Sequence, residues 1–370
     1  MQGADSLSTP RAFGYKTLTR TRIRQLSFTL GTTSLTPPIA LAPMAGITDR
    51  PFRDLVRSFG VGLMVSEMVA SQEMVQAKPG VRERAELSAD VENTSVQLAG
   101  REASWMAEAA RQVADRGARV IDINMGCPAK KVTSGYSGSA LLKTPDHALS
   151  LIEAVVEAVD IPVTLKTRLG WDDNCLNAAS VAARAEGAGV KMVTIHGRTR
   201  CQFYKGRADW AAIRAIKDAV SVPVLANGDI VDAETAKAAL DQSGADGVMI
   251  GRGIQGRPWL LAQVACDLWG SPAPKVPEGA DLIDMVSKHY EAMLSFYDAD
   301  LGVRVARKHL GWYMDLAQTE APLRRAVLTA KDPGQVLGLL PDALALRQPG
   351  QLSDDGALSP QSMSQREGAA

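Results

Sequence analysis

VTLKTRLGWDDNCLNAASVAARAEGAGVKMVTIH, at residues 163–196, contains one complete strand–helix–strand pattern. It begins and ends with short apolar runs rich in β-branched residues, at 163–166 and 192–196, which are typical of buried strands. Between them, residues 178–187 carry apolar side chains at steps of three and four, as on one face of a helix. Gly189 then marks the end of that helix. The pattern predicts two parallel strands joined by a crossover helix.

The same alternation repeats along most of the chain. Apolar runs of strand length occur at 39–42, 62–66, 95–98, 120–124, 163–166, 192–196, 222–226 and 247–250. Eight such units predict an α/β fold of the TIM-barrel type, a closed (β/α)8 barrel. A doubly wound open sheet is the competing arrangement, but the GxGxxG turn that usually follows its first strand is absent. In a barrel, the polar residues that close each strand are the candidate functional residues.

The pattern changes after the eighth run, where helical periodicity continues without strands. We therefore predict a TIM barrel over residues 35–258 and a second, small all-helical domain over 259–345. Residues 346–370 are rich in Gly, Ser and Gln and lack an apolar period, so a disordered tail is expected. Residues 1–34 form an N-terminal extension that is basic enough to resemble an import signal, but helix breakers interrupt it and favour a frayed terminus.

The composition excludes several classes of protein. The 370 residues include 41 basic and 41 acidic side chains, so any nucleic-acid contact must depend on a local basic patch. Four widely spaced cysteines without a CxxC pair or a zinc-type histidine pair indicate a reduced, cytoplasmic protein with no structural metal. No apolar run approaches the ~18 residues needed to cross a bilayer, so no membrane association is expected.

Small or polar residues close several of the predicted strands. The first run leads into a small-residue turn in which the backbone can approach a planar ring, and three later runs end in an amide, a cation and an imidazole. These residues are Pro43, Met44, Ala45, Gln97, Lys166 and His196. Singly, each fits an ordinary turn or a satisfied core polar group. Together they suit the polar rim of an isoalloxazine, where Lys166 can stabilise negative charge near N1–O2 of a reduced flavin.

The seventh and eighth runs end in glycine-rich turns. The first of these is Asn227, Gly228 and Asp229, and the second begins with Gly251 and Arg252. Turns at these two positions of a barrel commonly bind phosphate through backbone N–H groups. We therefore expect them to hold the phosphate of FMN.

The fourth run ends in Asn-Met-Gly-Cys-Pro, which places Cys127 in a loop at the mouth of the barrel. A lone cysteine is more often an inert small hydrophobe. Cys127, however, follows a flexible glycine and lies near Lys130 and Lys131 in the chain, which favours an exposed and reactive thiol.

These motifs together resemble the tRNA-dihydrouridine synthase family, and the pattern is most similar to its bacterial B-type branch, including the nitrogen-regulation-operon members. The motifs are Ala-Pro-Met-Ala-Gly at 42–46, Gln97, Asn-Met-Gly-Cys-Pro at 124–128, 166–168, His-Gly-Arg-Thr at 196–199, Asn-Gly-Asp at 227–229 and Gly-Arg-Gly at 251–253. The run RVARKHLGWY at 304–313 resembles the basic and aromatic pattern of that family's helical tRNA-binding domain. The resemblance covers roughly residues 35 to 330.

The resemblance implies an FMN enzyme that uses NADPH to reduce the C5=C6 bond of uridine in the D-loop of tRNA. It assigns the flavin to the residues of the mouth and phosphate turns named above, and the proton donor to Cys127. Hydride would add at C6, and a thiol with a pKa near ~8.5 would protonate C5. Substrate contacts are expected from Asn124 on the uracil, from Arg198, and from Arg304, Arg307 and Lys308 on the RNA.

Two other functions stay open at this point. One is a flavin barrel that acts on a free small pyrimidine, as dihydroorotate dehydrogenase does, although such a substrate would not require the helical domain. The other is a non-catalytic RNA-binding protein that kept the fold, against which the complete flavin rim and Cys127 argue. Since no separate dinucleotide motif is present, NADPH and RNA are expected to use the same mouth in turn. The sequence identifies no protein partner.

Overall fold

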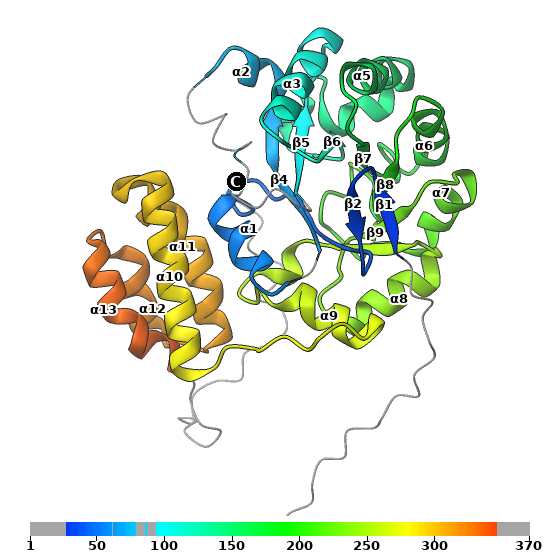
Figure 1. Cartoon of the computed structure of the whole chain (residues 1–370). Helices are drawn as coiled ribbons and strands as arrows, with labels where there is room; N and C mark the ends of the chain where they lie inside the picture. The colour runs from blue at the N-terminus through cyan, green and yellow to red at the C-terminus, as the bar shows by residue number, and fades with distance from the viewer. Residues whose placement is uncertain (1–26, 61, 79–85, 87–93, 346–370) are drawn as a thin grey trace, which may run out of the picture.

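The computed structural model describes residues 27–60, 62–78, 86 and 94–345. Eight parallel strands close into a barrel in the order β10-β3-β4-β5-β6-β7-β8-β9, which confirms the predicted TIM-barrel fold (Figure 1). The strands are β3 Ile39–Leu41, β4 Leu63–Ala70, β5 Thr94–Ala99, β6 Val120–Met125, β7 Val163–Arg168, β8 Met192–His196, β9 Val224–Asn227 and β10 Gly247–Ile250.

Helices surround the barrel and bury their apolar faces against the outside of the strands. They are α1 Arg50–Arg57, α2 Ser71–Val75, α3 Ala103–Asp115, α5 Pro145–Ala158, α6 Ala178–Gly187, α7 Arg214–Ala219, α8 Ala233–Ser243 and α9 Leu260–Trp269, with 3-10 turns η2 Gly138–Lys143, η3 Ala211–Ile213 and η4 Arg252–Ile254. The short helix α4 Lys130–Thr133 follows β6 and has no buried residue. Helix α8 illustrates how local sequence fixes the two ends of a helix. Asp232 and Thr235 form a capping box at its N-terminus, and Gly244 ends it at φ +66°.

A short antiparallel hairpin precedes the barrel and was not predicted. It pairs β1 Phe28–Leu30 with β2 Thr33–Leu35. Its residues Leu30 and Leu35 pack with Leu63, Val120 and Met192, which are the first residues of β4, β6 and β8. The hairpin therefore closes the end of the barrel at which the strands begin, and the opposite end is the one available for a site.

The helical domain consists of α10 Gly279–Tyr297, α11 Ala299–Leu316, α12 Ala321–Thr329 and α13 Pro333–Leu344 around a core of its own. Helix α9 was expected in this domain, but Leu260, Leu261 and Val264 pack in the outer core of the barrel. We therefore propose that the boundary lies in the segment 270–278. Residues 1–26 and 346–370, where an extension and a tail were predicted, lie outside the described residues. Among the helices described, none is long and apolar enough to span a bilayer.

The helical domain packs beside α1, close to the loop that follows β3 (Figure 1). The Phe52 ring lies 5.7 Å from that of His289 and 4.8 Å from that of His309, between ring centroids. The Tyr297 hydroxyl donates a hydrogen bond of 3.0 Å to Asp49 Oδ2. Burial lowers the pKa of His289 to about 3, so this apolar contact holds a neutral imidazole. The basic helix α11 is thereby fixed next to the barrel mouth.

Candidate active site at the barrel mouth

A buried chain of side-chain hydrogen bonds connects β5, β6 and β7 inside the barrel. Asn124 Nδ2 donates to Gln97 Oε1 at 2.7 Å, and Gln97 Nε2 donates to Asp122 Oδ2 at 2.6 Å. Thr164 Oγ1 donates to the other oxygen of Asp122 at 2.7 Å. The two-residue period of β6 explains this placement, because Val120, Asp122 and Asn124 share the interior face. Asp122 was not predicted as a site residue, although that same period was the signal that could have found it.

Asn124 also fixes the loop that carries the cysteine. Its Oδ1 accepts hydrogen bonds from the backbone N–H groups of Gly126 and Cys127, at 3.2 and 3.0 Å. Both ends of the Asn124 amide are therefore used within the protein. Its expected contact with uracil stays a prediction, but the structure gives it a positioning role toward Cys127.

Lys166 and Asn227 meet at the mouth although 61 positions separate them. Lys166 Nζ donates to Asn227 Oδ1 at 3.1 Å, and Asn227 Nδ2 donates to the Met249 carbonyl at 2.8 Å. Within the described part of the chain, this is the only hydrogen bond of the ammonium group, and it has no ion pair. Burial, and next the charge of Arg168, lower the pKa of Lys166 to about 8, against the opposite effects of Asp122 and Cys127. A desolvated cation with unused donors fits an electron-rich group of a bound ligand.

Cys127 is half-buried at the end of this arrangement. Burial raises the pKa of its thiol, and this effect is opposed by a hydrogen bond from the Ala129 backbone and by the charges of Arg168 and Lys166. The thiol is therefore protonated at neutral pH. The sequence suggested that Lys130 and Lys131 would influence it, but those side chains are exposed, and the cations that act on the thiol come from β7.

Arg168 organises the loops after β6 and β8 and was not among the predicted site residues. Its Nε donates to the Gly126 carbonyl at 2.8 Å, and its Nη1 donates to the carbonyls of Thr199 and Phe203. Its guanidinium lies 5.5 Å from the ring centroid of Tyr204, and that of Arg252 lies 4.9 Å from the same ring. The sequence signal was its position two residues after Lys166 on one strand, and therefore on the same face.

Arg198, which was expected among the substrate contacts, is engaged within the protein. Its side chain is 2% exposed, and it forms two hydrogen bonds with the carboxylate of Asp229, at 3.0 and 2.6 Å. It also donates to the carbonyls of Lys205 and Gly206 and lies 3.3 Å from His196 Nε2. Arg198 therefore fixes the β8 loop against the turn after β9.

The turn after β9, the first of the two predicted phosphate turns, has a tightly constrained backbone. A Cβ atom added at Gly228, which has φ +109°, would lie 2.6 Å from the His196 ring, so this position requires glycine. Asp229 follows at φ +53°, and its carboxylate also accepts from the Ala208 N–H at 2.7 Å and lies 3.8 Å from Arg252. Burial, and then the surrounding arginines and lysine, lower the pKa of His196 well below its usual value, so the imidazole is neutral.

The loop after β3, with Pro43, Met44 and Ala45, lies between the barrel mouth and the helical domain. Thr48 Oγ1 accepts from the Met44 N–H at 2.9 Å, and Glu67 accepts from the Gly46 N–H. Lys308 on α11 reaches this loop, because a Cβ atom added at Gly46 would lie 3.1 Å from its Nζ. One basic residue of the helical domain therefore lies directly at the mouth.

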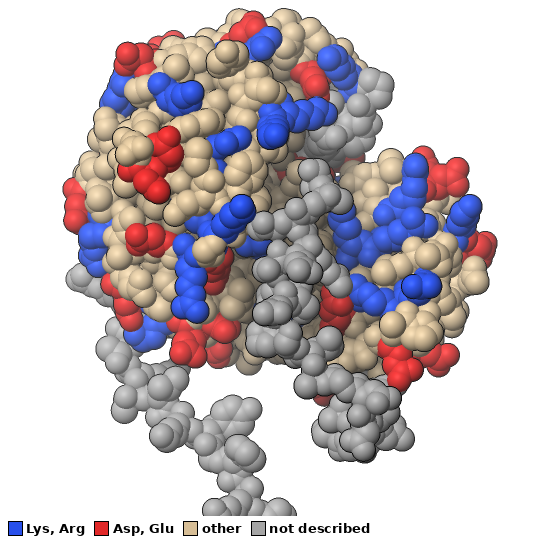
Figure 2. All heavy atoms as spheres, turned by 180° about the vertical axis from the view of Figure 1, so that it is seen from behind, with Lys and Arg blue, Asp and Glu red and all other residues tan. Residues whose placement is uncertain are grey.

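The other two predicted RNA contacts of the helical domain differ in exposure. Arg304 is exposed, and its Nε donates a hydrogen bond to the Asp300 carbonyl at 3.2 Å. Arg307 is half-buried, and its Nε has no partner within the residues that the structure covers. Figure 2 shows Lys and Arg side chains gathered where the helical domain borders the hollow between it and the barrel. This surface suits a polyanion.

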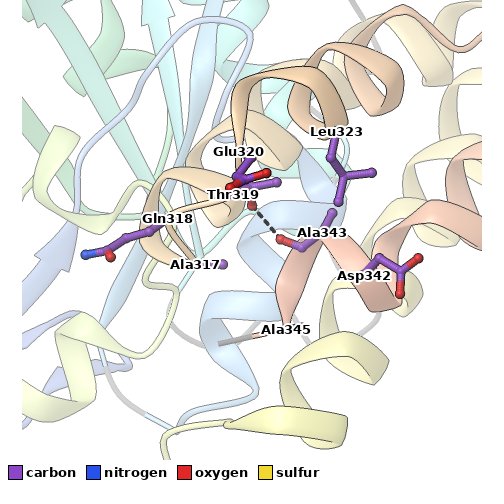
Figure 3. Close-up of a pocket in the computed structure, with 8 residues that line it drawn as sticks. All are labelled: Ala317, Gln318, Thr319, Glu320, Leu323, Asp342, Ala343 and Ala345. Carbon is purple, nitrogen blue, oxygen red and sulfur yellow. Dashed lines mark hydrogen bonds between the residues drawn. The ribbon is translucent and has the colours of Figure 1, made fainter. Parts of the chain in front are cut away.

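A small pocket of about 90 Å³ lies elsewhere, where the turn after α11 meets the end of α13 (Figure 3). Thr319 Oγ1 donates to the Ala343 carbonyl across it, and Glu320 and Asp342 line it. Its volume is far below the ~300–1,000 Å³ of typical ligand sites, and its carboxylates disfavour phosphate. The barrel mouth is therefore the candidate site.

Comparison with known proteins gives consistent matches. Residues 40–347 match the family model described as "Dihydrouridine synthase (Dus)". The chain is 64% identical over 325 residues to "Probable tRNA-dihydrouridine synthase" of Rhodobacter capsulatus, which covers 87% of this chain and 99% of that protein. It is 44% identical over 328 residues to "tRNA-dihydrouridine synthase B" of Xanthomonas axonopodis pv. citri, covering 88% and 99%. Among solved structures, histamine dehydrogenase from Rhizobium sp. 4-9 matches with a TM-score of 0.52 and 13% identity over 72% of this chain and 50% of that one, a likeness that concerns the fold alone.

Proposed function

Because this chain belongs to the dihydrouridine synthase family, we propose that it is an FMN-dependent enzyme that reduces uridine in the D-loop of tRNA to 5,6-dihydrouridine. NADPH is the reductant in this proposal, and the base and the nucleotide use the same barrel mouth in turn. The relatives named as tRNA-dihydrouridine synthases align along almost their whole length, which supports a shared activity.

The observation that carries the proposal is the positive charge concentrated at the mouth. The pKa values of Lys166, Arg168 and His196 are all lowered, by burial first and then by neighbouring cations. Two carboxylates lie near these groups, and both are already engaged within the protein, Asp122 by Gln97 and Thr164 and Asp229 by Arg198. Binding of an anion at such a site is favourable. FMN carries a negatively charged phosphate and, once reduced, negative charge on its ring. Gln97, Lys166 and His196 would hold the ring, and the turns at 227–229 and 251–252 the phosphate.

Cys127 is the proton donor in this mechanism. Reduced FMN, when bound, supplies the hydride for uridine C6. The C5=C6 bond is conjugated to the C4 carbonyl, so C5 must then take up a proton. Burial raises the thiol pKa and keeps the proton on sulfur until the base arrives, while Arg168 and Lys166 stabilise the thiolate that remains. Asn124 holds the thiol in place through its bonds to the loop backbone.

The helical domain supplies the discrimination against small substrates. Lys308 beside Gly46, together with exposed Arg304, can bind RNA phosphates while one uridine leaves its stack and enters the mouth. A free pyrimidine, as in a dihydroorotate-dehydrogenase-like reaction, would make no use of these residues.

The test is reduction of the purified protein with NADPH under anaerobic conditions, followed by mixing with unmodified tRNA, free uridine or orotate. Flavin absorption bands should be present or appear when FMN is added. The reduced flavin should be reoxidised by tRNA but not by free uridine or orotate. Nuclease digestion of that tRNA followed by mass spectrometry should detect dihydrouridine. A protein that takes up no FMN would overturn the proposal, and a flavoprotein that reacts with orotate but not with tRNA would establish the alternative.

A further inference from the structure

The loop that carries Cys127 presents one large aromatic side chain to solvent. Tyr136 is 73% exposed, more than any other large hydrophobic side chain that the structure describes. Its backbone is in the left-handed region, at φ +56°, which is uncommon for a bulky residue. A conformation of this kind persists only where the surrounding structure determines it, and such positions concentrate at functional sites.

The surrounding hydrogen bonds hold this turn in a single shape. The Tyr136 N–H donates to the Thr133 carbonyl at 3.1 Å, and the N–H and hydroxyl of Ser137 both donate to the Val132 carbonyl, at 3.4 and 3.0 Å. The N–H and hydroxyl of Ser139 donate to the Cys127 carbonyl, at 3.1 and 2.8 Å. The backbone of Tyr136 is therefore fixed by the turn, and its ring extends into solvent.

The same turn lies close to the proposed proton donor. A Cβ atom added at Gly138 would lie 2.9 Å from the Cys127 carbonyl oxygen and 3.3 Å from its Cβ. Tyr136 is only two residues before Gly138, so its backbone is within roughly 7 Å of that contact. On the other side, Arg200 is stacked between Trp171 and Phe203, at 4.7 and 4.8 Å from their ring centroids, and approaches Thr133 Oγ1 at 3.5 Å. The turn thus lies against the loops of β7 and β8 at the mouth.

The charge of this segment indicates the class of partner. Residues 126–145 contain Lys130, Lys131 and Lys143 and no acidic residue. All three lysines are exposed, and the first two lie on α4, immediately before the turn. An exposed ring flanked by cations that bind phosphate is the combination with which proteins hold unpaired nucleotides.

We propose that Tyr136 stacks on an unpaired nucleobase of the tRNA next to the uridine that enters the mouth, while Lys130 and Lys131 bind the adjoining phosphates. This inference rests on the proposed function and adds a substrate contact to it. The stack would occupy the position that the target uridine leaves empty in the RNA, beside Cys127, and so help to keep the loop of the tRNA open.

The backbone of Tyr136 provides the means of testing it. Tyr136→Phe and Tyr136→Trp keep a ring, whereas Tyr136→Gly and Tyr136→Asn remove it but accept a positive φ readily. Stacking predicts that the Gly and Asn variants bind tRNA about 5- to 150-fold more weakly, which corresponds to the ~1–3 kcal/mol of a stacked base, while Phe and Trp stay within about twofold of wild type. If position 136 serves only the conformation of the loop, all four variants should bind tRNA as wild type does, because Phe and Trp keep the backbone preference of Tyr and Gly and Asn accept a positive φ more readily.

The measurements are tRNA affinity at several salt concentrations and the rate of flavin reduction by NADPH in the holoenzyme. Tyr136→Asn should leave the salt slope and flavin reduction unchanged, whereas Lys130→Glu with Lys131→Glu should flatten the slope by about 2. Leu316→Ala, at a 39% exposed position on α11, is the control for loss of an exposed apolar side chain and should change neither quantity. Wild-type affinity in the Gly and Asn variants would overturn the inference. Failure of the wild-type protein to bind or reduce tRNA would instead overturn the proposed function.

Discussion

Raising the pH from 7 to 9 should weaken FMN binding by roughly tenfold, through the loss of one proton from Lys166. With a pKa of about 8, roughly nine-tenths of this side chain is charged at pH 7 and roughly one-tenth at pH 9. If only the ammonium form contacts the flavin ring, the dissociation constant rises in proportion, by about 1.4 kcal/mol in free energy. The FMN phosphate, like other phosphate monoesters, keeps its second charge over this range because its pKa is near ~6.

The stability of the protein without cofactor should change in the opposite direction. Burial lowers the Lys166 pKa from its ordinary value of 10.5 to about 8, so between these pH values the unfolded chain binds more protons than the folded one. Stability therefore rises with pH across this window, as far as Lys166 determines it. A rise in stability together with a fall in FMN affinity as the pH increases would distinguish the titration of Lys166 from general alkaline denaturation.

The assay is the quenching of FMN fluorescence on titration with apoprotein at pH 7, 8 and 9 and constant ionic strength. Lys166→Met should bind FMN more than about tenfold more weakly than wild type at pH 7, because it lacks the ammonium group altogether, and show no slope between pH 7 and 9. Lys166→Arg, which stays charged, should also show no slope. A wild-type dissociation constant that does not change with pH, or a methionine variant with the wild-type slope, would refute the reasoning.

Three further predictions follow from the site. Cys127→Ala should still bind FMN and accept hydride from NADPH, but single-turnover oxidation by tRNA should slow by ~10²–10⁴; an undiminished rate would exclude Cys127 as the proton donor. Arg304→Glu with Lys308→Glu should weaken tRNA binding and lower its salt slope by about 2, and an equal loss of NADPH oxidation would indicate misfolding instead. Arg198→Ala should lower the free energy of unfolding by about 2–3 kcal/mol, less than the ~3–5 of a fully buried pair because Asp229 is partly exposed, and should weaken FMN binding. A denaturation midpoint equal to that of wild type would contradict this role.

The sequence by itself determined the barrel, because the periods of strands and helices are local properties. The runs at 120–124 and 192–196 coincide with β6 and β8 almost residue for residue. Parallel strands in a closed barrel also end at the same mouth, so Lys166 and Asn227 could be grouped in advance and do meet. The hairpin β1–β2 was missed because its three-residue strands mix polar and apolar side chains, whereas the equally short β3 lies in a continuous apolar run.

Only the tertiary structure decided what the candidate residues do. Arg198 was expected to contact the substrate, and only the structure shows that its buried guanidinium pairs with Asp229, 31 positions away in the chain. The cations that act on Cys127 come from β7 and not from its neighbours in sequence. Lys308 approaches Gly46 from another domain. Such contacts depend on loops that have no period and on side chains brought together from distant positions, and local sequence patterns do not encode them.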